Sequence, residues 1–266
     1  MREFACPEPI TLQVKASAGA LYVIAEPRDT ATVDVTPYED TEACRDAADR
    51  TLVELRGDTL VVEAPDLTWR RRNARVRIEV RLPEDSRLKV KTAAANARLT
   101  GRYGDCVLDA ASADIELGHI AGWLRLHAAS GDVRVERVDG QVAADTASGD
   151  VKVGYAGGDA TVRTASGDVV VERADASVRV KTASGDLRLG AVRRGEVRLS
   201  TASGDVEIGV AAGTSVWLDL STAAGTTRSN LEQSGPPASG KPDLSVHVST
   251  ASGDIELRRV PLSAAA

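Results

Sequence analysis

Large aromatic side chains are scarce in this sequence of 266 residues. Phe, Trp and Tyr together make up 3% of the chain, and there is only one Phe and one Met. A compact domain with a thick core uses more large side chains, because aromatic residues supply much of its buried area. The composition therefore favours a thin core of Val, Leu, Ala and Ile between closely packed sheets.

Long apolar runs and an excess of basic charge are missing as well. No stretch approaches the ~18 apolar residues of a membrane-spanning helix. The segment from Met1 to Thr11 lacks the charged start and apolar run of a secretory signal. These absences predict no integral membrane segment and a cytoplasmic location. The formal net charge of −6 argues against a nucleic-acid partner.

Cysteine is equally sparse. The three cysteines form neither a CxxC pair nor a zinc-binding spacing. We therefore expect free thiols rather than disulfides or metal ligands at Cys6, Cys44 and Cys106. Cys106 falls in an apolar column of the repeat described below, which predicts a packing role.

Motifs that carry catalysis are also missing. The sequence has no Gly-rich phosphate loop, no HExxH and no nucleophile elbow. Its three histidines, His119, His127 and His247, are scattered, and the one serine that recurs does so too often to be a single nucleophile. We predict no enzyme activity, no catalytic residue and no bound cofactor or metal, and a small-molecule ligand is not expected.

What the chain does contain is a repeat. Ala-Ser-Gly-Asp or a close variant recurs at a nearly constant interval, which lengthens by one position before the sixth aspartate and by more before the last. The aspartates are Asp114, Asp132, Asp150, Asp168, Asp186, Asp205 and Asp254. A fixed period of about 18 residues indicates a repeat architecture whose units cannot bury a core alone.

One repeat contains two short strands and two corners. Asp132 to Glu136 and Gln141 to Thr146 alternate polar and apolar residues, as half-buried strands do. Asp139-Gly140 is a turn signal between them. When the copies are aligned, four columns stay apolar, among them the column of Val133, Val151, Val169, Leu187 and Val206.

Two topologies are compatible with this pattern. In a β-solenoid each strand lies parallel to its counterpart one repeat away, whereas in an antiparallel meander or sandwich it pairs with its sequence neighbour. Asp139-Gly140 suits a hairpin, but the equivalent positions, such as Gly157-Gly158 and Asp175-Ala176, do not keep that chemistry. We therefore predict an all-β, single-chain β-solenoid with coils of about 18 residues and keep the meander as the alternative.

The repeated aspartates have a structural and a functional interpretation. Stacked ~4.8 Å apart, their carboxylates repel one another unless turn N–H groups or nearby cations offset the charge. Calcium is the functional alternative, but basic neighbours such as Lys152 and Arg188 are a poor setting for a cation. We interpret these aspartates as structural turn residues.

The ends of the chain depart from the repeat. Residues 1–85 predict an irregular start of the solenoid with a cap, which includes a short helix at 41–50 and a hairpin at 53–62. Residues 86–260 hold the repeats, with a flexible loop at about 229–243, and 261–266 form a tail. The coil at Ile255–Val260 has no obvious cap, so we expect it to be an open end that can self-associate.

Two groups of residues are candidates for binding. The first is the densest basic cluster, which can lie in a solvated loop or meet an anionic partner or membrane surface. The second consists of two tryptophans at outward or corner positions, which mark an interface if they are exposed. Trp217 can equally well pack under the loop at 229–243. The candidate interaction residues are Trp69, Arg70, Arg71, Arg72, Trp123 and Trp217.

Several segments resemble the DUF4097 family of β-strand repeat proteins, often labelled adhesins. They are the Thr-Ala-Ser-Gly-Asp-Val unit, Pro-Glu-Pro-Ile at 7–10, Glu-Val-Arg-Leu-Pro at 79–83 and Val-Trp-Leu-Asp-Leu at 216–220. The likeness spans nearly the whole chain and is greatest to actinobacterial members. It implies a single-chain β-solenoid and brings no established catalytic residues.

These observations predict a non-enzymatic scaffold or adhesin-like interaction protein. Its expected partner is another protein or a second copy of itself, joined end to end. Two alternatives stay open: a β-helix enzyme that acts on polysaccharide, and a surface adhesin stabilised by calcium.

Overall fold

Parallel pairing between strands that lie one repeat apart in the sequence defines the architecture. The computed structural model describes residues 1–65, 74–231 and 242–261. The chain divides into two compact units, Met1–Glu136 and Arg137–Ala266. Among the described residues, none of the helices is both long and apolar enough to cross a membrane.

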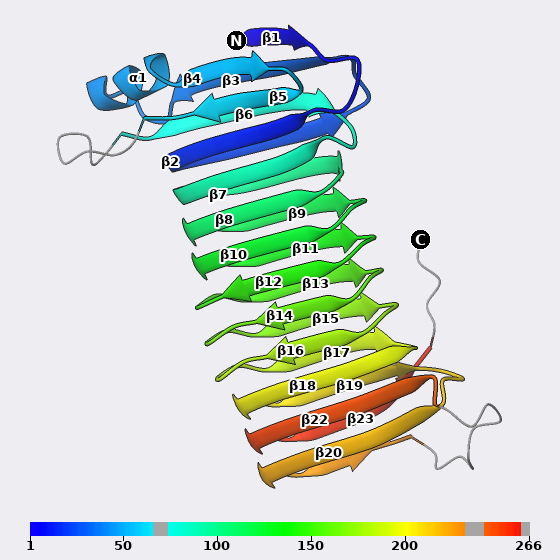
Figure 1. Ribbon diagram of the computed structural model, residues 1–266. Coiled ribbons are helices and arrows are strands. Elements are labelled where there is room, and N and C mark those ends of the chain that lie inside the picture. Colours follow the sequence, from blue (N-terminus) through cyan, green and yellow to red (C-terminus); the bar gives the residue numbers. More distant parts are fainter. Residues whose placement is uncertain (66–73, 232–241, 262–266) are drawn as a thin grey trace. The chain divides into compact units, whose positions relative to one another are not determined.

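The N-terminal unit contains one helix and a series of strands (Figure 1). They are β1 (Arg2–Ala5), β2 (Thr11–Glu26), β3 (Thr30–Pro37), α1 (Glu42–Asp49), β4 (Leu52–Arg56), β5 (Thr59–Glu63), β6 (Val76–Pro83), β7 (Arg87–Tyr103), β8 (Cys106–Ser112), β9 (Ile115–Ile120), β10 (Leu124–Ser130) and β11 (Val133–Val138), which runs into the second unit.

Regular coils begin at β2 in this unit. β2 pairs in parallel with β5 and β6 on one side and with β7 on the other. β8 and β10 continue the series, and Leu88, Cys106 and Leu124 face one another in register. All three side chains are at most 2% exposed, so the apolar column predicted from the sequence forms the core.

Antiparallel strands and the helix form the irregular start. β3 pairs with β1 and β6, and β4 pairs with β5, all antiparallel. The helix predicted at 41–50 is α1, which begins after Thr41, whose hydroxyl accepts the N–H of Cys44 at 3.3 Å. The hairpin at 53–62 is confirmed as β4 and β5, which turn at Gly57.

The C-terminal unit consists of strands alone within its described residues. They are β12 (Val142–Thr146), β13 (Val151–Ala156), β14 (Ala160–Arg163), β15 (Val169–Ala174), β16 (Val178–Lys181), β17 (Leu187–Val192), β18 (Gly195–Ser203), β19 (Val206–Ala211), β20 (Val216–Ala224), β21 (Thr227–Ser229), β22 (Leu244–Ser252) and β23 (Ile255–Val260).

The strands of this unit form two parallel ladders. β12, β14, β16 and β18 pair in succession, and so do β13, β15, β17 and β19. Val142 lies opposite Ala160, and Ala160 opposite Val178, which reproduces the period of the repeat. The β-solenoid is confirmed, and the antiparallel meander is wrong for the repeats.

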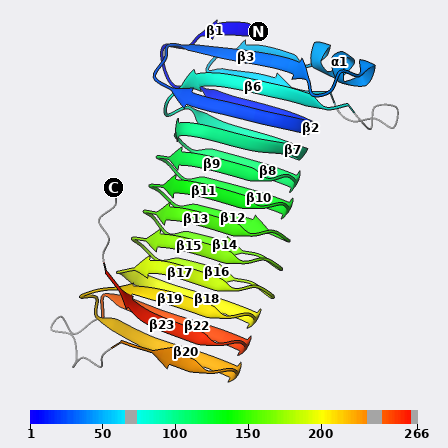
Figure 2. The same cartoon turned by 180° about the vertical axis from the view of Figure 1, so that it is seen from behind.

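The last two coils do not follow chain order. β22 pairs with β18 on one side and with β20 on the other, and β23 likewise lies between β19 and β21 (Figures 1 and 2). The expectation that Ile255–Val260 forms an open end is therefore wrong. Among the described residues of this unit, β20 and β21 form the outermost coil, although they precede β22 and β23 in the sequence.

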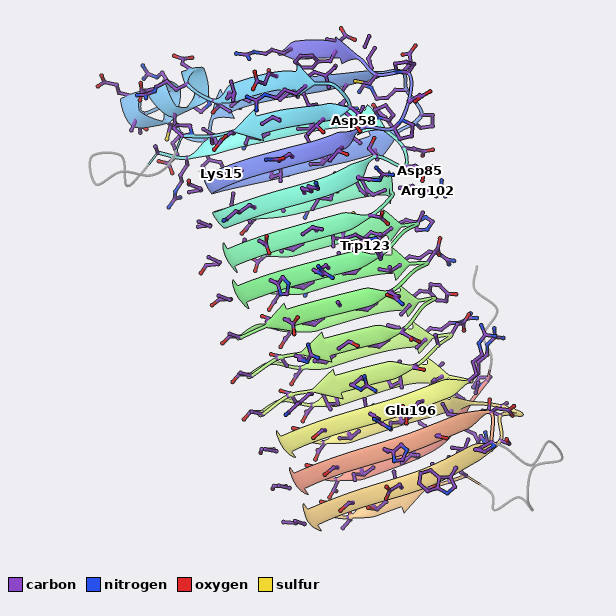
Figure 3. All side chains as sticks on the ribbon, in the orientation of Figure 1. Lys15, Asp58, Asp85, Arg102, Trp123 and Glu196 are labelled. Atoms are coloured by element: carbon purple, nitrogen blue, oxygen red, sulfur yellow. The ribbon has the colours of Figure 1, made fainter. Side chains whose placement is uncertain are left out.

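The core consists mainly of aliphatic side chains, as the composition predicts. Inward positions carry Val, Leu, Ile and Ala, while charged and polar side chains cover the outward positions (Figure 3). Tyr103 is the largest fully buried side chain among the described residues, and its hydroxyl lies 2.8 Å from the carbonyl oxygen of Val23 and 2.7 Å from that of Thr100. Burial raises the pKa of Tyr103 well above its usual range.

All three cysteines are free thiols in buried positions. Cys106 is 0% exposed in its apolar column. Burial raises the pKa of the Cys106 thiol to about 12, so this group stays protonated near neutral pH.

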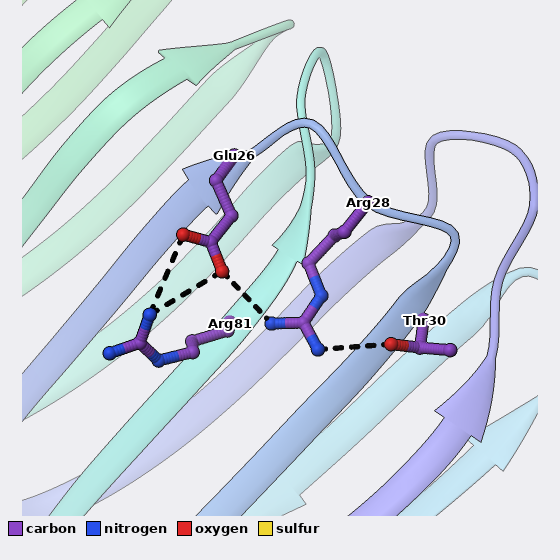
Figure 4. Close-up of polar contacts among 4 residues, drawn as sticks. All are labelled: Glu26, Arg28, Thr30 and Arg81. Carbon is purple, nitrogen blue, oxygen red and sulfur yellow. Dashed lines mark hydrogen bonds and ion pairs between the residues drawn. The ribbon is translucent and has the colours of Figure 1, made fainter.

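Ion pairs and hydrogen bonds among Glu26, Arg28, Thr30 and Arg81 stabilise the turn between β2 and β3 (Figure 4). Glu26 accepts from Arg28 at 3.2 Å and from Arg81 of β6 at 3.4 Å. Arg28 also donates to the hydroxyl of Thr30 at 2.9 Å. These contacts join β2, β3 and β6 at one end of the irregular start.

Candidate interaction surfaces

The corner aspartates form a hydrogen-bonded ladder with the backbone. In the C-terminal unit, Oδ1 of Asp168 accepts the N–H of Asp186 at 2.8 Å, and Oδ1 of Asp186 accepts the N–H of Asp205 at 2.8 Å. Asp150 and Asp205 accept in the same way from Asp168 and Asp254. In the N-terminal unit, Asp114 accepts from Asp132 at 3.1 Å.

These N–H groups lie where they offset the repulsion between carboxylates. The bond from the N–H of Thr226 lowers the pKa of Asp254. The cations two residues further along pair elsewhere: Lys152 lies 2.9 Å from Glu172, and Arg188 lies 3.5 Å from Glu207. In residues 1–65, 74–231 and 242–261, no group of three or more potential metal ligands is placed to hold an ion.

The predicted interaction residues are not gathered at one place in the described structure. Trp69, Arg70, Arg71 and Arg72 lie outside the described residues. Trp123 precedes β10 in the N-terminal unit and is 38% exposed, with the guanidinium of Arg125 5.7 Å from its ring centre (Figure 3). Trp217 belongs to β20 of the C-terminal unit and is 49% exposed.

β20 and β21 form an open sheet edge in the C-terminal unit, which we call the β20 edge. In the described part of the chain, β20 contacts β22 and β21 contacts β23, and neither strand has a partner on its other side. Leu218 and Leu220 point toward the core but are only half-buried. Their register partners on β22, Val246 and Val248, are at most 3% exposed.

A groove of about 350 Å³ crosses β16, β18, β22 and β20 on the outer face of the same unit. One column of its lining consists of ionisable side chains, and its members are the register partners Arg179, Arg198, His247 and Asp219. The next column consists of Lys181, Ser200, Ser249 and Ser221. We call this feature the serine groove.

The serine groove could not be predicted from the sequence, because its columns depend on β22 lying between β18 and β20.

A cluster of arginines around Tyr155 is a second feature that the sequence did not indicate. The Arg137 and Arg173 guanidiniums lie 4.3 and 5.6 Å from the Tyr155 ring centre, and the tyrosine hydroxyl donates to Asp175 at 2.9 Å. Spacing alone gives a weak signal for it, since Tyr155 and Arg173 occupy one column and are separated by one repeat.

Asp175 sits at the centre of that cluster with only 12% of its side chain exposed. Burial raises its pKa, but the bond from Tyr155 and the charges of Arg173 and Arg193 outweigh burial, and the net pKa is lowered. The carboxylate therefore stays ionised and holds the surrounding arginines. We interpret this cluster as a structural tie between neighbouring coils.

The chain matches the model of one protein family over most of its length. The family model described as Toastrack DUF4097 matches residues 26–258, which is most of the sequence. The chain belongs to this family. Membership confirms the resemblance carried by the Thr-Ala-Ser-Gly-Asp-Val unit, and Toastrack names the stacked-coil fold described above.

Solved structures similar to this Toastrack chain share little sequence with it. A candidate adhesin from Bacteroides fragilis is 13% identical over 97% of this chain and 95% of its own, with a TM-score of 0.45. A candidate lipid-binding protein from Parabacteroides distasonis is 13% identical with the same coverage and a TM-score of 0.43. A candidate adhesin from Parabacteroides merdae is 9% identical over 97% and 95%, with a TM-score of 0.37. No curated protein matches the chain.

Proposed function

We propose that this chain is a non-enzymatic interaction scaffold that self-associates through the β20 edge. The observation that carries the proposal is the outer side of β20, which no described strand pairs with, together with the half-buried Leu218 and Leu220 beneath it. An open edge offers a row of backbone donors and acceptors to another strand. Pairing also covers apolar side chains that the fold leaves partly in water.

The sequence of β20 suits pairing. Natural edge strands often carry a lysine, a proline or a bulge, which prevents unwanted association. β20 (Val216–Ala224) has none of these features, and Asp219 is its one charged residue. Its exposed aromatic residue, Trp217, is of the type that dominates the binding energy of interfaces. The strand therefore has few features that oppose a partner.

A second copy of the same edge is the partner that fits best. In the N-terminal unit, the coil that starts at β2 is covered by β5 and β6, which carry the antiparallel strands β4 and β3. That surface does not reproduce the open parallel edge, so head-to-tail stacking lacks matching ends. Two β20 edges can instead pair antiparallel about a two-fold axis, which yields a closed dimer rather than a filament.

Sedimentation velocity over a concentration series tests this proposal. We expect a monomer–dimer equilibrium in the unmodified chain and at least tenfold weaker dimerisation in Leu220→Lys, because lysine places a charge at the edge. The matched control is Val170→Lys on β15, at an outward position whose register partners are Lys152 and Arg188. Circular dichroism and thermal melts verify that both variants fold.

The outcomes separate three models. Dimers in the control and monomers in Leu220→Lys support the β20 edge. Filaments would show that the ends join head to tail, and a strict monomer at high concentration would reject self-association. Equal dimerisation in both variants would place the interface elsewhere.

A further inference from the structure

The serine groove presents a row of hydroxyl groups on the outer face of the sheet. Its Ser200, Ser249 and Ser221 side chains follow one another on adjacent strands, ~4.8 Å apart. None of the three hydroxyls has a hydrogen-bond partner among the described residues. β18, β22 and β20 therefore each present one free hydroxyl donor and acceptor at equivalent register positions.

Positive charge is concentrated at one end of the serine groove. Lys181 continues the serine column on β16 and has no carboxylate within ion-pair distance in the described structure. Arg179 lies beside it and reaches Glu196 only at 3.9 Å. Arg198 is better neutralised, since its guanidinium lies 2.7 Å from Glu196. Lys181 and Arg179 are therefore available to an anion.

The other end of the serine groove adjoins an aromatic pair. The His247 and Trp217 rings lie 5.0 Å apart, and Nδ1 of His247 lies 3.3 Å from Asp219. Trp217 is half exposed beside the lining residues. An apolar ring face next to hydroxyl and carboxylate groups is suited to the face of a sugar ring, which is apolar at its C–H bonds and polar at its edge.

Three of the four strands of the serine groove, β16, β18 and β22, cannot hold a peptide by strand addition. β16, β18 and β22 each have strand partners on both sides, so their N–H and C=O groups are used within the sheet. A ligand on this face must be recognised by side chains. From β16 to β20 the serine column spans three strand spacings, roughly 14 Å, which suits a short segment of an extended polymer.

We infer that the serine groove binds an acidic polysaccharide as a ligand without cleaving it. Lys181 and Arg179 pair with a carboxylate or sulfate group, the serine hydroxyls bind sugar hydroxyls on successive residues, and Trp217 contacts a ring face. Ser200 and Lys181 lie two and three strands away from the β20 edge, so their contacts do not depend on pairing there, whereas Ser221 and Trp217 belong to β20 itself.

Isothermal titration calorimetry of the full chain tests the inference with four probes: an oligogalacturonate, dextran sulfate, neutral dextran and polyglutamate. We expect binding of at least one of the two acidic polysaccharides and little heat with the other two probes. Lys181→Gln should weaken that binding roughly tenfold, the loss expected when one charge-assisted hydrogen bond is removed. Ser200→Tyr, which fills the groove from an exposed outer position, should abolish it.

Lys152→Gln is the matched control, because it removes the same charge from an exposed position on β13 that pairs with Glu172. If both lysine variants weaken polysaccharide binding equally, the binding depends on general surface charge, and the proposal of a site at the serine groove is wrong. Equal binding of polyglutamate would show an acidic peptide partner instead. Absence of binding to both oligogalacturonate and dextran sulfate would reject the polysaccharide, and shortened oligosaccharides after incubation would show cleavage rather than binding alone.

Discussion

Corner glycines allow neighbouring coils of the C-terminal unit to approach closely. Gly185 has a φ of +136°, a backbone conformation that residues other than glycine rarely adopt. A Cβ added to Gly185 would lie 2.1 Å from the carbonyl oxygen of Gly167 in the preceding coil. The glycine of the repeated tetrapeptide is therefore required both by backbone conformation and by contact, while the following aspartate supplies an acceptor to the next coil.

Gly185→Ala should destabilise the chain by at least ~2 kcal/mol, because the backbone must shift in addition to adopting a strained φ. Gly213→Ala is the matched control: Gly213 also has a positive φ, +81°, but no atom lies within 4 Å of the added Cβ. The control should lose only about 1 kcal/mol. Urea titrations of both variants measure the difference, and equal losses would mean that contact between corners contributes nothing.

The order of the last coils distinguishes what the sequence predicts from what it does not. Periodicity predicts the strands, the parallel ladders and the apolar columns, because each depends on residues within one or two repeats. It does not predict that β22 and β23 lie inside β20 and β21. Every coil presents the same kind of apolar column, so nothing local to residues 244–260 selects one neighbouring coil over another.

The serine groove is unpredictable for the same reason. Ser200, Ser249 and Ser221 are not separated by the repeat period, and only the insertion of β22 makes them neighbours. The corner aspartates as far as Asp186, in contrast, could be identified from the sequence, because both their spacing and their bonding partners follow the period. The partner of Asp205 is Asp254 of the inserted coil, which the period does not predict. The sequence indicates Trp217 as a candidate interaction residue, but its position on an open edge depends on the order of the coils.

Matched leucine substitutions test the coil order. Leu257 of β23 is 1% exposed and faces Ile208 on one side and Ser229 on the other. Leu257→Ala should cost about 2–5 kcal/mol, the usual range for a buried leucine. Leu220→Ala removes the same atoms from the outermost coil, where the side chain is half-buried, and should cost less than half as much. Denaturant titrations measure both, and a smaller loss for Leu257→Ala would indicate stacking in chain order.

A solenoid unit is held together by contacts between adjacent coils, so its stability is distributed along the stack. Each coil depends mainly on its neighbours, and local opening begins where a coil has only one. In the described part of the C-terminal unit, the coil of β20 and β21 has one such neighbour, and its second strand, Thr227–Ser229, is exposed throughout. The coil formed by β22 and β23 has a neighbour on each side and should open later.

Hydrogen exchange monitored by mass spectrometry should therefore show protection that does not follow the sequence. At a concentration low enough to keep the chain monomeric, peptides from β20 and β21 should exchange first, those from β22 and β23 next, and those from β18 and β19 later. Raising the protein concentration should slow hydrogen exchange in β20 selectively if the β20 edge pairs with a second copy. Pairing protects the N–H groups of β20 that point away from β22. Faster exchange in β22 and β23 than in β20 and β21 would contradict the inserted coil. Slowing spread evenly over the unit would instead show an association that does not use this edge.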